Sequence, residues 1–354
     1  MSTNGNGKKN NGDMHRRTKP VRCIDLFCGI GGFRVAIEAV CEARGLSHNA
    51  VFSSDIDAEC RKAYAANFKD DPSGDITKVA ESDVPDHDIL LAGFPCQPFS
   101  ICGDMKGFED TRGTLFFDIA RILKAKQPAA FVLENVKLLV GHDNGRTLGR
   151  IMATLKGLGY HADKKVLNAL DFGLPQKRER VFIVGFRDPC VFDWPTGDIP
   201  MIPLADLLEK NPPKSVYASD YIRQNRLKAM QPTDEPTIWH ENKAGHISAY
   251  PFSCALRAGA SYNYLLVNGE RRLTPREMLR LQGFPDSFKI VCNDYQARKQ
   301  AGNSVPVPVV RAVLEKTFDA LGWTEVLKYR QKVSHVAFDD QHRLFEKKRV
   351  GAVA

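Results

Sequence analysis

The chain has 354 residues, of which 43% are hydrophobic, and this is enough to bury a sizeable core in more than one domain. Its 50 lysines and arginines outnumber 42 aspartates and glutamates, and the net charge of +8 suits an anionic partner such as nucleic acid. The nine cysteines are scattered without a C-x-x-C pair, which argues against a zinc cluster or a disulfide framework and favours free thiols in a reducing cytoplasm. No apolar run could span a bilayer and the first residues lack the apolar core of a signal peptide, so we expect a soluble, cytoplasmic protein.

Residues 1–20 have almost nothing to bury and are expected to form a flexible basic arm. From residue 21 onward, apolar strands alternate with amphipathic helices, which predicts an α/β fold with a parallel sheet covered on both faces. We expect strands at 21–27, 50–56, 88–94, 129–136 and 180–186, and helices at 33–43, 58–68, 115–125, 149–159, 219–230 and 273–284. Residues 301–321, which begin with AGNSVP, are expected to form a loop that leads into a final helix.

The pattern changes after Phe186, where prolines crowd and clear periodicity fades. This change predicts a second, smaller and more irregular domain. The expected divisions are a main domain at 21–187, the irregular domain at 188–270, a hinge and return segment at 271–295, a segment at 296–328 that completes the main domain, and a charged tail at 329–354.

A glycine-rich turn, DLFCGIGGF, joins the first predicted strand to the first helix. Gly29 and Gly31 let the backbone turn sharply and approach a ligand at the start of the helix. A dinucleotide fingerprint would need a glycine at Arg34, and no Walker-type Gly-Lys-Ser/Thr follows. The turn therefore predicts either a nucleoside-like ligand without a pyrophosphate or a purely structural role.

Two aspartates lie at the ends of predicted strands. Asp55 ends the second strand, 26 residues after Gly29, where a carboxylate can accept hydrogen bonds from ribose hydroxyls. Asp75, in GDIT, ends a further predicted strand, beside the expected position of an adenine amino group. Each aspartate alone is also typical of a helix cap, but their joint position at the carboxyl ends of strands favours a cofactor site.

The stretch GFPCQPFS places Cys96 just beyond a strand end, between two prolines that restrict the backbone. A thiolate is a nucleophile, and a free thiol with a pKa of about 8.5 ionises little at neutral pH without nearby positive charge or amide donors. Because P-C-Q-P on a polar loop is a poor core sequence, we predict that Cys96 is reactive.

Charged side chains also interrupt two apolar strands. Glu134 ends the strand AAFVLENV, where it needs either a salt-bridge partner or a role as a group of raised pKa that shares a proton with a base nitrogen. Arg178 and Arg180 are two residues apart in QKRER, so both face one way if the segment is extended. They could meet a phosphate, carboxylate or carbonyl oxygen, or lie on a solvated edge strand.

The order of these motifs resembles the DNA cytosine-5 methyltransferases of bacterial restriction–modification systems, over about residues 21–321. The motifs are DLFCGIGGF, SDID, GDIT, GFPCQPFS, RGTLFF, ENV, QKRER, RLTPRE with RLQGFP, and AGNSVP. The resemblance implies a Rossmann-like, S-adenosylmethionine-dependent methyltransferase fold that faces a target-recognition domain across a cleft for double-stranded DNA. It also implies a monomer without a metal or a membrane, accompanied by a restriction endonuclease that acts separately.

The same resemblance implies a role for each matching position. Cys96 matches the nucleophile that adds to C6 of cytosine, and Glu134 matches the glutamate that contacts N3 and the exocyclic amine. Arg180 matches the arginine at the base carbonyl, with Arg178 supporting the same pocket. The positions that match the S-adenosylmethionine site are Phe27, Gly29, Gly31, Asp55, Ile56, Asp75, Ile76, Pro95, Leu115, Asn303 and Ser304.

The chemistry of the implied reaction explains these residue types. Addition of a thiolate at C6 makes C5 of cytosine electron-rich enough to attack a methyl sulfonium, and this divides one hard step into easier ones. The reacting carbon lies inside the stacked duplex, so the nucleotide must be turned out of it. A tRNA cytosine-5 methyltransferase of the same fold is the alternative. Recognition domains of the family often carry a Thr-Leu pair, where this chain has Ala255 and Leu256.

Overall fold

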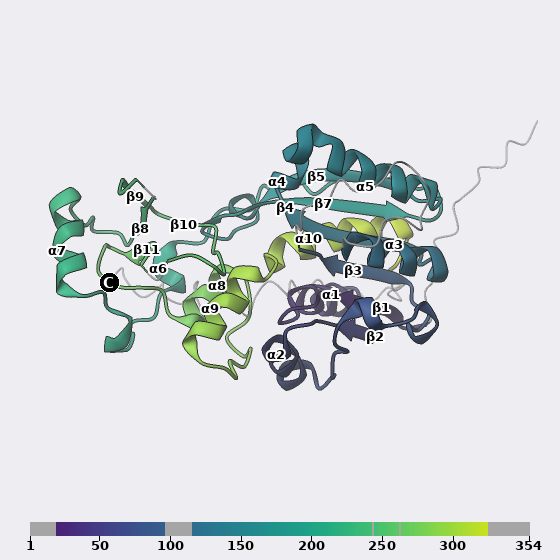
Figure 1. Cartoon of the computed structure of the whole chain (residues 1–354), viewed down its shortest axis with the longest axis horizontal. Coiled ribbons are helices and arrows are strands. Elements are labelled where there is room, and N and C mark those ends of the chain that lie inside the picture. Colours follow the sequence, from purple (N-terminus) through teal and green to yellow (C-terminus); the bar gives the residue numbers. More distant parts are fainter. Residues whose placement is uncertain (1–18, 96–114, 243, 262, 325–354) are drawn as a thin grey trace, which may run out of the picture.

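The computed structural model describes residues 19–95, 115–242, 244–261 and 263–324. Cys96, most of the predicted basic arm and the predicted tail therefore lie outside the described residues. Figure 1 shows a large sheet with its helices towards one end of the long axis and a small sheet towards the other. Two helices, α8 (Pro275–Leu281) and α9 (Asp294–Asn303), lie between these two parts.

The large sheet contains β1 (Val21–Leu26), β2 (His48–Ser54), β3 (Ile89–Gly93), β4 (Ala130–Val136), β5 (His161–Asn168) and β7 (Glu179–Phe186). Their order is β2-β1-β3-β4-β7-β5. The pairs among β2, β1, β3 and β4 are parallel, whereas β7 runs antiparallel to both β4 and β5. The carboxyl ends of β1, β2, β3 and β4 therefore meet at one edge of the sheet.

Helices cover both faces of this sheet, as the alternation of strands and helices predicts. Along β3, Ile89 and Leu91 pack into one hydrophobic cluster while Leu90 and Ala92 pack into the other, as the two-residue period of a strand requires. The first cluster includes α1 (Gly32–Ala43) and α10 (Val307–Leu321), and the second includes α3 (Leu115–Lys126) and α5 (Arg146–Gly157). Helix α2 (Ala58–Phe68) follows β2.

The predicted parallel sheet is correct for β1 to β4 and wrong at β7, which is antiparallel to both of its neighbours. Strand β5 leads to β7 through a short connection that contains only the 3-10 helix η5 (Ala169–Asp171) and β6 (Gln176–Lys177). A parallel neighbour needs a crossover of a dozen or more residues, so this connection reverses the chain. Strand β5 itself was not predicted, because HADKKVLN is an exposed edge strand with two lysines and no apolar run.

Two further predictions need correction. Asp75 does not end a strand, because it caps the 3-10 helix η1 (Ile76–Lys78) by accepting hydrogen bonds from the Thr77 N–H and hydroxyl. The start of AGNSVP was expected to be a loop, but Ala301–Asn303 are the last residues of α9. That helix begins at an Asn293 cap, which accepts from the Gln296 N–H at 3.0 Å.

The small sheet has the antiparallel order β11-β8-β9, formed by β8 (Ile238–Glu241), β9 (Ile247–Tyr250) and β11 (Leu265–Val267). Trp239 of β8 is fully buried at its centre. Gly269 packs against the Trp239 ring so closely that an added Cβ would lie 2.4 Å away. Strand β10 (Ser253–Cys254) pairs with β6, and this pairing joins the small part of the molecule to the large one.

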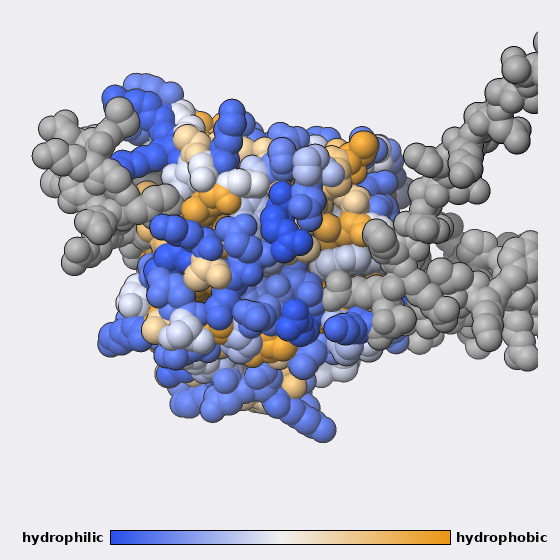
Figure 2. Space-filling model, turned by 90° about the vertical axis from the view of Figure 1, so that its right-hand side faces the viewer, coloured by the Kyte–Doolittle hydropathy of each residue, from blue (hydrophilic) through white to orange (hydrophobic). Residues whose placement is uncertain are grey.

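Short helices complete the described part of the chain. They are α4 (Leu138–Gly141), α6 (Leu204–Leu207), α7 (Asp220–Ala229), η2 (Glu81–Asp83), η4 (His142–Gly145) and η6 (Lys214–Val216). Figure 2 looks onto the end of the molecule that carries the large sheet, where polar residues cover most of the described surface and apolar residues form small separate patches. None of the described helices has the length and apolar character that a membrane crossing requires.

Candidate active site

The glycine-rich turn leaves β1 in a conformation that favours glycine. Gly29 and Gly31 have φ angles of 53° and 87°. Phe27, the residue directly after β1, has a φ angle of 55°. A Cβ on Gly31 would lie 2.2 Å from the Phe68 ring, whereas a Cβ on Gly29 would meet no atom of the described residues within 4 Å. Close packing therefore requires Gly31, while a ligand could approach the Cα of Gly29 without meeting the described part of the chain.

Asp55 fixes this turn from the end of β2. Its Oδ2 accepts a hydrogen bond from the Gly29 N–H at 2.8 Å, and its Oδ1 accepts one from the Asp57 N–H at 2.8 Å. Burial raises the pKa of Asp55, although the two N–H donors act in the opposite direction. Each carboxylate oxygen keeps a second lone pair for a ligand hydroxyl. The neighbouring Ile56 side chain is 75% exposed and offers an apolar surface beside that carboxylate.

Asp75 and Ile76 contribute differently from one another. Hydrogen bonds from the Thr77 N–H and hydroxyl lower the pKa of Asp75 and so favour its ionised form. Ile76 is buried in the hydrophobic cluster with Ile24 and Leu26. Its side chain therefore supports the site from the core, and its backbone carbonyl accepts from Arg121 Nη2 at 2.7 Å.

The loop between α9 and α10 closes over the glycine-rich turn. A Cβ on Gly32 would lie 2.6 Å from Val305 Cγ2 and 3.0 Å from Ser304 Oγ. Val305 also lies beside Gly93 at the end of β3, 3.5 Å from the position of an added Cβ. Of the two predicted site residues in AGNSVP, Ser304 is buried against the predicted cofactor turn, whereas Asn303 is exposed.

Glu134 lies at the centre of the sheet edge, and β3–β4 pairing sets it opposite Gly93. It is 7% exposed, and its Oε1 lies 3.0 Å from Arg180 Nε on β7. Burial raises the pKa of Glu134, with the positive charge of Arg180 as the largest opposing cause. The carboxyl therefore holds a proton more readily than one in water, which suits a group that shares a proton with a base nitrogen.

The chain leaves β3 towards Cys96 next to this pair. Asn135 Nδ2 donates to the Phe94 carbonyl oxygen at 2.9 Å and fixes the backbone just before the exposed Pro95. Cys96 follows Pro95 and is the first residue of the range 96–114, which the structure does not describe. Leu115, predicted to line the cofactor site, is the half-buried first residue of α3.

Arg178 lies between β6 and β7 and is 2% exposed. Its Nη1 donates to the Leu256 carbonyl oxygen at 3.0 Å, and its Nη2 donates to those of Ser304 at 2.6 Å and Gly302 at 3.3 Å. Burial, together with the charge of Arg180, lowers the pKa of Arg178. Of the two predicted arginines, Arg180 thus reaches Glu134, whereas Arg178 is committed to backbone carbonyls.

Sequence reasoning missed Asp25, which is 1% exposed within β1. Neither of its carboxylate oxygens has a hydrogen-bond partner among the described residues, and the same is true of the buried Tyr64 hydroxyl. Burial raises the pKa of Asp25 well above its usual range, against the opposing charge of Arg34. The signal was present in the sequence, because an acid interrupts the apolar run VRCIDLF.

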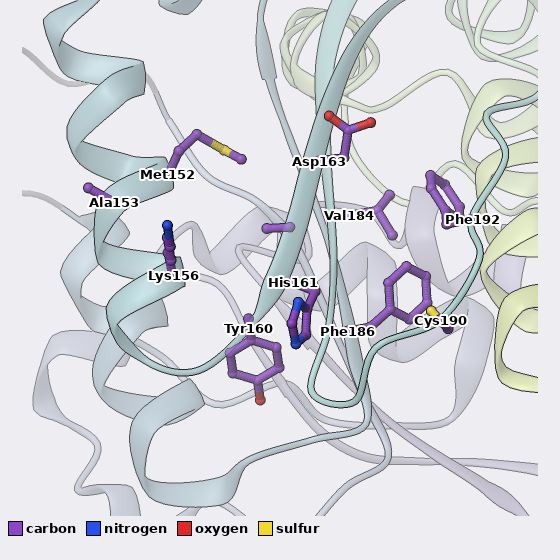
Figure 3. A pocket seen from close by; sticks show the side chains of 11 residues that line it. Met152, Ala153, Lys156, Tyr160, His161, Asp163, Val184, Phe186, Cys190 and Phe192 are labelled. Carbon is purple, nitrogen blue, oxygen red and sulfur yellow. The ribbon is translucent and has the colours of Figure 1, made fainter.

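A cavity of about 570 Å³ lies elsewhere on the large sheet. Figure 3 shows its lining side chains around the start of β5, with Met152 and Lys156 on α5 and Phe192 beyond the end of β7. His161, in this cavity, pairs with Phe186, whereas Arg180 is paired six residues further along β5. At about 3.4 Å per residue this is roughly 20 Å, so the cavity is separate from the Glu134 site.

Comparison with known proteins agrees with this geometry. Residues 21–319 match the family model described as C-5 cytosine-specific DNA methylase. The chain is 58% identical over 296 residues to type II methyltransferase M.NgoBI of Neisseria gonorrhoeae, covering 82% of this chain and 91% of that protein. It is 53% identical over 306 residues to M.HaeII of Haemophilus aegyptius, covering 86% and 94%.

Among solved structures, the Entamoeba histolytica methyltransferase EhMeth is similar with a TM-score of 0.66 at 18% identity, covering 86% of this chain and 99% of that one. At that identity the similarity shows a shared fold. The family match covers most of the chain, and the curated relatives are matched over nearly their whole length. The chain therefore belongs to the C-5 cytosine-specific DNA methylases and is a DNA (cytosine-5)-methyltransferase of the restriction–modification type, with a Rossmann-like, S-adenosylmethionine-dependent methyltransferase fold.

Proposed function

We propose that the enzyme methylates C5 of a specific cytosine in duplex DNA through a transient bond between Cys96 Sγ and C6 of a nucleotide turned out of the helix. The main support is the buried Glu134–Arg180 pair, with 3.0 Å between Oε1 and Nε. It lies at the carboxyl end of β4, beside the end of β3 that leads to Cys96. A separately acting restriction endonuclease with the same target sequence is part of this proposal.

In this proposal Glu134 and Arg180 hold the cytosine ring by its polar edge. Glu134 faces N3 and the exocyclic amine, and the raised pKa of its carboxyl lets it share a proton with N3. Arg180 faces the base carbonyl oxygen with its guanidinium. Both contacts draw electron density out of the ring, which makes C6 a better target for a thiolate.

In this proposal the methyl transfer takes three steps. The Cys96 thiolate adds to C6, and the electron pair of the C5–C6 double bond makes C5 nucleophilic. S-adenosylmethionine, when bound, would supply a methyl group on a positively charged sulfur. C5 would take up that methyl group as the sulfur–methyl bond breaks, and the electron pair of that bond would stay on the sulfur of S-adenosylhomocysteine. A base then removes the proton from C5, and the returning electron pair restores the double bond and expels the Cys96 thiolate.

The residues around the glycine-rich turn fit S-adenosylmethionine. Asp55 has oxygen lone pairs for the ribose hydroxyls, and the exposed Ile56 side chain offers an apolar surface to the adenine ring. Gly29 leaves space for close approach of the ligand to the backbone. Gly29, Asp55 and Ile56 follow the carboxyl ends of the neighbouring strands β1 and β2, which is where open α/β sheets bind nucleosides. They supply space, hydrogen-bond acceptors and an apolar surface for a nucleoside without a pyrophosphate.

The test is covalent capture. Bisulfite sequencing of DNA from cells that express the enzyme first maps the methylated site, and a duplex with 5-fluorocytosine at that position is then incubated with enzyme and methyl donor. Fluorine cannot leave C5 as a proton does, so the wild-type enzyme should form a stable adduct that survives denaturation. Cys96→Ser should form none and yet bind the unmodified duplex.

Two outcomes would contradict this proposal. An adduct formed equally by Cys96→Ser would remove Cys96 from the mechanism. Methylation of transfer RNA, with no adduct on any duplex, would support the alternative substrate of the same fold.

A further inference from the structure

A buried polar cluster lies where four segments of the chain meet, at residues 176–178, 256–258, 281–282 and 301–304. Its members are Gln176, Arg178 and Gln282, which are 0%, 2% and 0% exposed. We call these three residues the junction cluster. Each of them makes hydrogen bonds to backbone groups of other segments. The junction cluster therefore fixes how these segments lie against one another.

Arg178 spans two of the segments with one guanidinium. Nη1 donates to the Leu256 carbonyl oxygen at 3.0 Å, just beyond β10. Nη2 donates to the carbonyl oxygen of Ser304 at 2.6 Å, in the loop that leads into α10, and to that of Gly302 at 3.3 Å, in the last turn of α9. The planar fork of arginine supplies these donors in a fixed geometry.

The two glutamines complete the connection. Gln176 Oε1 accepts from the Leu256 N–H at 3.0 Å, and its Nε2 donates to the Leu281 carbonyl oxygen at 2.8 Å and to Gln282 Oε1 at 3.3 Å. Gln282 Nε2 in turn donates to the Ala301 carbonyl oxygen at 2.6 Å. Leu256 is thus held by both its N–H and its carbonyl group.

The backbones also touch directly at this point. A Cβ on Gly302 would lie 2.5 Å from the Ala258 nitrogen and 2.7 Å from the Arg257 carbonyl carbon. These are backbone atoms, which cannot move aside as a flexible side chain can. The segments 256–258 and 301–304 therefore have little freedom to shift independently.

Each segment leads to a different part of the site. Residues 256–258 continue from β10 and precede β11 of the small sheet. Ser304 and Val305 pack onto Gly32 of the proposed cofactor turn, and Val305 reaches Gly93 beside Glu134. The junction cluster thus lies between the small sheet, which belongs to the expected target-recognition domain, and the glycine-rich turn that is proposed to hold the methyl donor.

Resting on the proposed function, we propose that Arg178 is a positioning residue that couples DNA binding to cofactor binding, by joining the backbone of residues 256–258 to that of residues 302–304. A packing role alone would not need it, because apolar residues of similar volume often replace buried charges without loss of stability. Its Nη groups are used by carbonyl oxygens, which separates Arg178 from the base-contacting role of Arg180.

The test measures coupling between the two ligands. The affinity for S-adenosylhomocysteine is measured by calorimetry with and without a duplex that carries the mapped methylation site. In the wild-type enzyme the duplex should raise this affinity by about 5-fold or more, the lower end of typical coupling between sites. In Arg178→Lys that ratio should fall to about 1, while the affinity without DNA changes by less than about 3-fold, because the cofactor turn itself is intact.

Arg226→Lys is the matched control. Arg226 is 3% exposed, and its Nη2 donates to Glu241 Oε2 at 2.6 Å and to the Asn263 carbonyl oxygen at 2.9 Å. Both partners lie within the small part of the molecule, so this variant loses a similar buried fork but should keep the wild-type ratio. If Arg178→Lys fails to fold, Gln176→Met removes a neighbouring link with a side chain of similar shape and should also lower the ratio.

The outcomes are distinguishable. A wild-type ratio near 1, an unchanged ratio in Arg178→Lys, or an equal loss in Arg226→Lys would each overturn the inference. If Arg178→Lys does not fold, an affinity ratio that is unchanged in Gln176→Met would also overturn the inference. Failure of the wild-type enzyme to methylate the mapped duplex would instead overturn the proposed function.

Discussion

At the scale of single residues, the Glu134–Arg180 pair shows how the sheet edge controls charge. Burial raises the pKa of Glu134 and outweighs the opposing charge of Arg180. The protonated carboxyl is therefore favoured more strongly in the folded chain than in the unfolded one. This contribution to stability is fully present below the unfolded pKa of about 4.3, and it is lost as the pH rises through the raised pKa of the folded state.

Arg180→Gln should destabilise the fold increasingly as the pH rises. The substitution removes the nearest positive charge, so it raises the pKa of Glu134 further and leaves its ionised form unpaired. The difference in unfolding free energy from wild type should be small near pH 5 and grow by at most about 1.4 kcal/mol per pH unit, towards about 3–5 kcal/mol. Urea unfolding from about pH 5 to pH 9 measures it.

The control for this variant is Arg187→Gln. Arg187 pairs with the 80% exposed Asp188 side chain at 3.3 Å, so its loss should cost less than about 1 kcal/mol at every pH. A pH-independent cost in Arg180→Gln would show that its charge does not act on Glu134.

The sequence predicted these site residues unevenly, and the reasons are physical. Glu134 and Asp55 stood out because each is a charge at the end of an apolar strand. Asp25 is also a charge in an apolar strand, but it is the first residue of the motif DLFCGIGGF. The sequence alone does not show a role for Asp25 apart from that of the motif. The burial of Ile76 in the core depends on how η1 packs under the sheet, which no local pattern specifies.

At the scale of elements, α8 explains the motif RLTPRE. The Thr274 hydroxyl accepts from the Glu277 N–H at 3.2 Å, and Glu277 Oε2 accepts from the Thr274 N–H at 2.8 Å, with Pro275 in the first turn. The fully buried Glu277 carboxylate also pairs with Arg271 through two hydrogen bonds of 2.8 and 2.9 Å. One glutamate thus caps a helix and neutralises a buried arginine.

Glu277→Gln should therefore be strongly destabilising. It leaves Arg271 buried without a carboxylate, and breaking such a pair costs about 3–5 kcal/mol. Thr274→Ala, which removes only the cap, should lower the free energy of unfolding by about 1 kcal/mol. Thr274→Ser should lower it by much less, because serine keeps the capping hydroxyl. Urea unfolding at neutral pH measures all three, and a cost below about 1 kcal/mol for Glu277→Gln would contradict the pairing.

Periodicity predicted most elements but not how they connect. Helix α2 was predicted at its observed bounds, and the structure adds the Asp57 cap at which it begins. Strand β5 was missed since an exposed edge strand needs no apolar run, and the reversal of β7 follows from a connection whose length has no local signal. Directions of strands are decided by connections and packing, whereas their existence is decided by hydrophobic pattern.

At the scale of the whole molecule, the two parts are joined through the β6–β10 pairing and the junction cluster. The many prolines after Phe186 predicted a second domain, but they did not predict its small sheet around Trp239. Strands of three or four residues carry too little pattern to be read from sequence alone. Which DNA sequence is recognised depends on which of its side chains reach base edges, and a hydrophobic pattern does not encode that.

We predict that residues 188–268 determine the methylated site. Replacing them with the matching segment of a type II methyltransferase that methylates another sequence should move methylation to the site of the donor. Each mismatched base pair typically costs about 1–3 kcal/mol, so the chimera should disfavour the original site by at least about 5-fold per changed base pair. Bisulfite sequencing of expressing cells measures the pattern directly.

The junction with the large sheet sets the design of that exchange. Leu256 lies inside the exchanged segment, and its N–H and carbonyl oxygen bond Gln176 and Arg178 outside it. A second chimera should therefore keep residues 253–258 of this chain and exchange the rest. If site choice belongs to the side chains of the small part, both chimeras methylate the donor site, and the second does so with the higher turnover because its junction is native. Methylation of the original site by both would place recognition outside residues 188–268.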